Sequence, residues 1–135
     1  MTKTATATRT AAELVQEARA EVENVAPKDA YDEIKTGQAV ALDVREPVEW
    51  EHHIEGAVQV PRGLLEFAAD PTSPRHKAEL DPSRRVIVYC RSGARAVLAA
   101  QTLKMMGFEN VANLDGGFGA WTKDGLPETE HHSDL

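Results

Sequence analysis

Short apolar runs alternate along this chain with longer segments of helical pattern. The runs are Val40–Val44, Ala57–Val60, Val86–Tyr89 and Val111–Leu114. Each is too short for a core helix and suits a buried strand. Parallel strands need a crossover between them, usually a helix, so the alternation predicts an α/β fold: a small parallel sheet with helices on both faces.

The segments between the runs carry helix start and stop signals. The clearest helix is predicted over Ala94–Met106, where Gly107 follows as its C-cap. Pro27 opens another, which extends to about Lys35. Phe118 and Trp121 belong to a last helix and are expected in the core.

An extra helix is predicted at the N-terminal side of this pattern. Apolar residues recur at helical spacing from Ala11 to Val22, with Thr10 as N-cap and Glu13 completing a capping box. We therefore expect a tail and helix over residues 1–21, one domain over 22–127, and a C-terminal tail over 128–135. Residues 1–9 and the segment after Pro127 are expected to be loose.

Composition limits the class of protein. With 135 residues, 41% of them hydrophobic, the chain is expected to form a single core. Its 15 basic and 22 acidic residues give a net charge of −7, which argues against nucleic-acid binding. No apolar run is long enough to span a membrane, and neither a secretory signal nor a cofactor is expected. One cysteine forms no internal disulfide, so a cytoplasmic protein is expected.

That cysteine, Cys90, directly follows the Val86–Tyr89 run and precedes the predicted helix. A helix N-terminus presents unpaired backbone N–H groups and a partial positive charge, which favour an anion. A thiol in such a loop is expected to lose its proton easily and to act as a nucleophile. The alternative is a buried, inert cysteine that serves only as a small apolar residue.

The rest of the loop reads Arg91-Ser92-Gly93-Ala94-Arg95. Its two arginines can attract an anion against the acidic background of the chain, and Ser-Gly permits a tight turn. Function in parallel sheets lies at the carboxyl ends of the strands, where Cys90 and Asp43 both fall. We therefore expect residues 91–95 to bind an anionic substrate.

Three segments in order resemble signatures of the rhodanese-homology domain. They are Leu42–Trp50 with His53–Ala57, Val86–Arg95, and Asn113–Trp121. The resemblance covers about residues 22 to 127 and indicates a single-domain member. It departs from the family pattern at His52, where a glycine is common, which reduces backbone freedom in that turn.

The resemblance implies a sulfurtransferase of the thiosulfate type. Cys90 is expected to attack the outer sulfur of thiosulfate, release sulfite and carry a persulfide to cyanide, a small thiol or a protein thiol. Loop amides are expected to stabilise the sulfur anion. Arg62 falls in a stretch that often borders the family's pocket and is a further candidate for substrate binding, whereas Asp43 and Arg45 are expected to be structural.

Two alternative functions remain open. Cysteine phosphatases and arsenate reductases also place a thiolate and an arginine in an anion-binding loop, but with five residues between them, whereas four separate Cys90 from Arg95. A non-catalytic rhodanese-like binding module is the other alternative. The neighbouring pairs His52-His53 and His131-His132 lack a third placed ligand and are expected to be polar surface, so no metal site is predicted.

Overall fold

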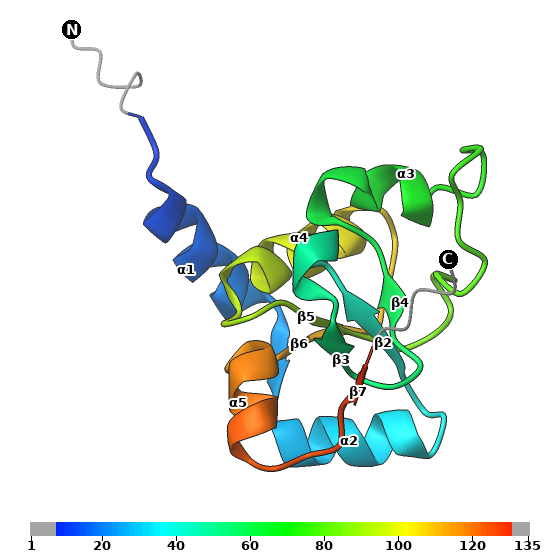
Figure 1. Cartoon of the computed structure of the whole chain (residues 1–135). Coiled ribbons are helices and arrows are strands. Elements are labelled where there is room, and N and C mark those ends of the chain that lie inside the picture. The colour runs from blue at the N-terminus through cyan, green and yellow to red at the C-terminus, as the bar shows by residue number, and fades with distance from the viewer. Residues whose placement is uncertain (1–7, 131–135) are drawn as a thin grey trace, which may run out of the picture.

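The computed structural model describes residues 8–130 as an α/β fold around a five-stranded parallel sheet (Figure 1). The strand order is β1-β6-β5-β2-β4, with every neighbouring pair parallel. These strands span Glu23–Val25 (β1), Val40–Asp43 (β2), Val58–Gln59 (β4), Val86–Tyr89 (β5) and Val111–Leu114 (β6). The α/β class with a parallel sheet is thus confirmed.

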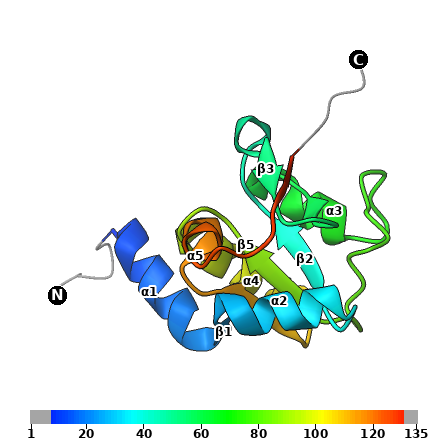
Figure 2. The same cartoon turned by 60° about the horizontal axis from the view of Figure 1, so that its bottom comes forward.

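Helices cover both faces of this sheet. They span Ala11–Glu21 (α1), Pro27–Lys35 (α2), Leu65–Ala69 (α3), Ala94–Met105 (α4) and Gly117–Lys123 (α5), with short 3₁₀ turns at Pro47–Glu49 (η2) and Arg62–Leu64 (η3). Figure 1 shows α3 and α4 above the sheet and α2 and α5 below it, and Figure 2 shows the lower face turned toward the viewer. The extra N-terminal helix is present.

Alternation along the central strand explains why both faces are covered. Val86 and Val88 of β5 belong to the core beneath α1, α3 and α4, whereas Ile87 and Tyr89 belong to the core against α2 and α5. Successive side chains of a strand point to opposite faces, so a strand buried on both sides reads as a continuous apolar run. Trp121 of α5 is buried in the lower core, as predicted.

The helix termini follow the predicted signals. Thr10 accepts a hydrogen bond from the Glu13 backbone N–H at 3.0 Å, and the Glu13 carboxylate accepts one from the Thr10 N–H at 2.8 Å, which completes the capping box of α1. Arg9 forms an ion pair with Glu17. Residues 1–7 of the predicted N-terminal tail lie outside the described residues.

The prediction of a loose C-terminal tail is wrong for residues 128–130. Thr129–Glu130 (β7) pairs antiparallel with His52–His53 (β3), and Glu128 accepts a hydrogen bond from Thr122 at 2.8 Å. The pairing joins segments far apart in the chain, which a local pattern of two residues does not reveal. Residues 131–135, including His131 and His132, lie outside the described part.

Within residues 8–130, no helix combines the length and the apolar character that a bilayer crossing requires.

Candidate active site

Cys90 lies immediately after β5, where the chain turns into α4. Cys90 is only 1% exposed to solvent. Its Sγ accepts hydrogen bonds from the backbone N–H groups of Gly93 at 3.0 Å and Ala96 at 3.4 Å. Gly93 is the N-cap of α4 and adopts φ +121°, which bends the loop around the sulfur. Backbone donors aimed at one sulfur atom stabilise negative charge on it, because they solvate the thiolate in place of water.

The loop is fixed from below by the start of α5. The backbone N–H of Phe118 donates to the Cys90 carbonyl at 2.8 Å, and that of Gly119 donates to the Arg91 carbonyl at 2.9 Å. Gly117 has φ +65°, and a Cβ built on it would lie 2.5 Å from the Arg91 carbonyl oxygen. Only glycine permits this backbone conformation together with this close approach, so the turn into α5 requires glycine at this position.

The two arginines of the loop have different surroundings. The exposed Arg91 side chain makes no hydrogen bond or ion pair with another described residue. Arg95 donates from Nη1 and Nη2 to the two carboxylate oxygens of Glu49, at 2.8 and 3.1 Å. This hydrogen-bonded pairing lowers the pKa of Glu49 to about 2, so the carboxylate compensates the Arg95 charge.

Glu49 belongs to this site although no sequence pattern points to it. The residue lies in η2, where its carboxylate also accepts a hydrogen bond from the Glu46 backbone N–H at 2.9 Å. The spacing of Glu46, Pro47 and Glu49 signals a local cap, but nothing in it points to an arginine 46 positions further along the chain. The contact arises because β2 and β5 are neighbours in the sheet.

Ser92 and Ala94 are exposed in the loop, whereas Gly93 is buried. Arg62 lies elsewhere: its guanidinium donates to Glu66 and to the Thr102 hydroxyl, each at 3.1 Å. Thr102 is eight residues beyond the start of α4, a distance of about 12 Å along the helix. Residues 90–95 are therefore brought together, while the contacts of Arg62 hold it further along α4. Its substrate role stays a prediction.

Charged residues at the end of the neighbouring strand β2 form a buried pair. Asp43 is fully buried and accepts hydrogen bonds from the Arg45 backbone N–H at 3.0 Å and from Arg45 Nη2 at 2.9 Å. The same Nη2 donates to the His52 carbonyl at 2.8 Å, and the guanidinium lies 4.5 Å from the Phe118 ring centroid. The pair thus links β2, β3 and α5, which agrees with the structural role expected for it.

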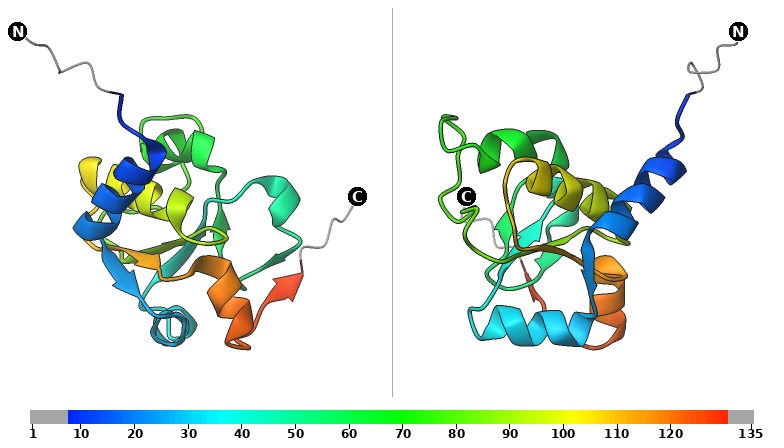
Figure 3. Two further views of the ribbon diagram at one scale, coloured as in Figure 1. Left: turned by 90° about the vertical axis from the view of Figure 1, so that its left-hand side faces the viewer. Right: turned by 180° about the vertical axis from the view of Figure 1, so that it is seen from behind.

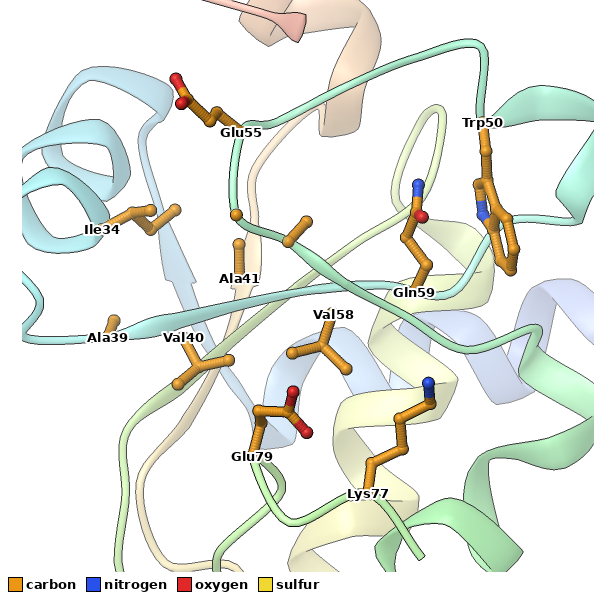
Figure 4. Close-up of a pocket in the computed structure, with 12 residues that line it drawn as sticks. Ile34, Ala39, Val40, Ala41, Trp50, Glu55, Val58, Gln59, Lys77 and Glu79 are labelled. Atoms are coloured by element: carbon orange, nitrogen blue, oxygen red, sulfur yellow. The ribbon is translucent and has the colours of Figure 1, made fainter. Parts of the chain in front are cut away.

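Two surface hollows differ in their relation to Cys90. One, of about 430 Å³, borders the loop and is lined in part by Arg91, Glu49 and Phe118. Another, of about 530 Å³, lies beside the edge strand β4 and contains none of residues 90–95 (Figure 4). Trp50 Nε1 and Gln59 Nε2 near it are buried without a hydrogen-bond partner among the described residues. Of these two hollows, the one beside Arg91 is therefore the one that borders the loop after Cys90, although Cys90 itself does not line it.

No cluster of three or more potential metal ligands occurs in the described part of the chain. His52 and His53 form β3, where His52 approaches Glu128 at 3.6 Å.

Comparison with known proteins identifies the family. The model of the rhodanese-like domain matches residues 26–124. The chain is 35% identical over 106 residues to a probable adenylyltransferase/sulfurtransferase, MoeZ, of Mycobacterium tuberculosis; the match covers 77% of this chain and 26% of that protein. The chain thus spans about a quarter of the length of this relative.

Two solved structures extend the comparison. A polysulfide-sulfur transferase homodimer from Wolinella succinogenes superposes with a TM-score of 0.71 at 32% identity, covering 90% of each chain. A protein of unknown function from Rhodopseudomonas palustris, described as a possible tyrosine phosphatase, superposes with a TM-score of 0.84 at 36% identity, covering 96% of this chain and 99% of that one. The chain belongs to the rhodanese-like domain family, an enzyme superfamily that includes sulfurtransferases.

Proposed function

We propose that this protein is a thiosulfate-type sulfurtransferase that works through a persulfide on Cys90. The observation that carries the proposal is the pair of backbone N–H groups, from Gly93 and Ala96, that donate to Cys90 Sγ at the carboxyl end of β5. The sulfurtransferase relatives support the same chemistry. An inert core cysteine has no need for two backbone donors arranged around its sulfur.

In the first half-reaction, the Cys90 thiolate attacks the outer sulfur of thiosulfate. A new S–S bond forms on Cys90 while the S–S bond of thiosulfate breaks, and its electron pair leaves with sulfite. The product persulfide carries one negative charge near the Gly93 and Ala96 donors, which stabilise charge there. Exposed Arg91 adds a positive charge that attracts the dianionic donor.

In the second half-reaction, an external nucleophile takes the outer sulfur. Cyanide attack produces thiocyanate and restores the Cys90 thiolate, and a thiol acceptor takes the sulfur as its own persulfide. Since the chain has only one cysteine, no internal disulfide can discharge the intermediate. We therefore propose a small anionic sulfur donor and an external small-molecule or protein thiol acceptor. Polysulfide, named for the Wolinella relative, is a second donor class.

Mass spectrometry of the intact protein after thiosulfate treatment tests this mechanism directly. We expect a gain of one sulfur atom, its retention after the donor is removed in thiol-free buffer, and its loss when cyanide is added. The matched control is Cys90→Ser, which is expected to gain no sulfur. Absence of the gain in the parent protein, or rapid concentration-independent loss of the sulfur without an acceptor, contradicts the proposal.

A phosphatase is the second candidate because of the Rhodopseudomonas relative. Two features of the loop argue against it here. Only four residues separate Cys90 from Arg95, and the Arg95 guanidinium is already engaged by Glu49. Hydrolysis of p-nitrophenyl phosphate distinguishes the two functions: a Cys90-dependent turnover of this substrate, in a protein that takes no sulfur from thiosulfate, favours the phosphatase.

A further inference from the structure

Helix α1 lies outside the matched family domain, yet it brings an arginine to the active loop. The rhodanese-like match begins at residue 26, whereas α1 spans Ala11–Glu21. Figure 3 shows α1 running beside α4, the helix that follows the Cys90 loop. The arginine of interest is Arg19, in the last turn of α1.

The Arg19 guanidinium lies against Gly93. Its Nη2 and Nη1 atoms are 3.5 and 3.7 Å from the position of a Cβ built on Gly93. The backbone N–H of this same glycine donates to Cys90 Sγ at 3.0 Å. Only Gly93 therefore lies between the guanidinium and the nucleophilic sulfur, so their separation is comparable to the screening length of about 8 Å at physiological ionic strength.

The charge of Arg19 is not compensated. The half-buried side chain makes no hydrogen bond or ion pair with any described residue. In contrast, Arg95 is neutralised by Glu49, although it belongs to the loop itself. Among the described residues, Arg91 and Arg19 are therefore the arginines near the loop whose charges have no partner, one on the loop itself and one on α1.

The backbone around Arg19 is held firmly. Ala18 and Val22 are buried in the upper core, and the Lys104 ammonium of α4 donates to the Glu21 carbonyl at 2.7 Å. Asn24 of β1 donates to the Arg19 carbonyl at 3.2 Å and accepts a hydrogen bond from the buried Asn113 at 3.0 Å. These contacts hold the end of α1 beside the loop, so the fold itself sets the backbone position of Arg19.

We infer that Arg19 is a donor-binding residue that α1 adds to the rhodanese-like loop, where it favours dianionic sulfur donors. The inference rests on the proposed sulfurtransferase function and adds selectivity to it. Coulomb attraction depends on the product of the charges, so the contribution of Arg19 is larger for dianionic thiosulfate than for a monoanionic thiosulfonate, which offers the same kind of sulfur.

The test measures the second-order rate constant for sulfur loading of Cys90. Arg19→Gln keeps much of the side-chain shape without the charge, and Arg19→Lys restores the charge. We expect Arg19→Gln to lower the rate constant about three- to tenfold with thiosulfate and less with a thiosulfonate. Arg19→Lys is expected to recover most of the loss. The matched control, Arg9→Gln, removes a charge just before α1 that is already paired with Glu17 and is expected to change loading less than twofold.

Loading rates for Arg19→Gln equal to those of the parent protein overturn the inference. An equal loss in Arg19→Lys and Arg19→Gln also overturns it, because it shows a role in packing rather than charge. A second measurement separates this inference from the proposed function: calorimetric titration of thiosulfate into Cys90→Ser, with and without Arg19→Gln. Weaker binding in the double variant supports the role of Arg19 even if the parent protein transfers no sulfur, and equal binding overturns it.

Discussion

The loops after β2 and β5 begin side by side in the sheet, where Asp43 pairs in register with Tyr89, but they use their charges differently. After β2, the buried carboxylate of Asp43 is satisfied by the buried guanidinium of Arg45. After β5, backbone donors converge on Cys90 Sγ, and Arg91 is left exposed and unpaired among the described residues. Compensated charge holds the framework together, whereas uncompensated charge is available to a substrate.

Replacing the nucleophile is expected to have the largest effect. Cys90→Ser should lower sulfur transfer from thiosulfate to cyanide by about a thousandfold or more, because a serine hydroxyl is a far weaker nucleophile at neutral pH. The near-identical shape of serine should leave the fold intact. Steady-state thiocyanate formation and thermal unfolding measure the two quantities. A serine variant that keeps a substantial share of the activity contradicts the covalent mechanism.

Breaking the buried Asp43–Arg45 pair after β2 should lower the stability of the fold rather than remove the nucleophile. Arg45→Met leaves the Asp43 carboxylate buried without its charged partner, which should lower the free energy of unfolding by about 3–5 kcal/mol. Urea denaturation measures this change. Arg62→Met, which removes a partly exposed arginine paired with Glu66, is the control and should cost less than about 1 kcal/mol. Similar losses of unfolding free energy in both variants would contradict the view that the buried Arg45 pair stabilises the fold more than the partly exposed Arg62 pair.

Gly117→Ala should damage the loop through its backbone. The added Cβ meets the Arg91 carbonyl oxygen at 2.5 Å and requires an alanine at φ +65°. We expect a loss of about 1–3 kcal/mol in stability together with a large drop in sulfur transfer, because the loop must shift. Gly37→Ala is matched in φ, at +80°, but has no atom within 4 Å of its Cβ. Gly37→Ala should therefore lower stability without changing sulfur transfer. Unchanged sulfur transfer by Gly117→Ala would contradict the prediction, because it would show that the loop tolerates the shift.

Arg95→Ala should reduce kcat/KM for thiosulfate about tenfold. The structure gives the reason: without Arg95, the Glu49 carboxylate beside the loop is uncompensated and repels a dianion. The double variant Arg95→Ala/Glu49→Gln should therefore recover most of the loss. If it recovers none, Arg95 acts by contacting the donor itself and not by neutralising Glu49.

The smallest expected effect is a pH dependence of stability from Glu49. Its pKa is lowered to about 2 in the folded protein, so its contribution is fully present above the unfolded value of about 4.5 and is lost as the pH falls through about 2. Both partners are partly exposed, so the contribution is about 0.5–1 kcal/mol after solvent screening. Unfolding free energies of the parent protein and Glu49→Gln between pH 5 and 2 should converge at the acid end. A constant difference contradicts this assignment.

Local patterns predicted much of this molecule because they fix local structure. The apolar run of β5, the cap of α1 and the start of α2 at Pro27 each depend on a few neighbouring residues, and each was predicted correctly. The sequence did not predict the ion pair of Glu49 with Arg95, the contact of Arg19 with Gly93, or the pairing of β7 with β3. Those contacts depend on which strands are neighbours and on how a separate helix packs, and no local spacing encodes either.

The burial of Cys90 limits the shape of the sulfur acceptor. With the residue only 1% exposed, the sulfur lies below the molecular surface, and a persulfide extends the side chain by one S–S bond, about 2 Å. We expect a cyanide ion or a cysteine on a slender, projecting loop to reach that atom more readily than a cysteine on a flat surface. The same depth keeps the sulfur atoms of two such molecules apart, so oxidation is expected to leave the protein uncrosslinked.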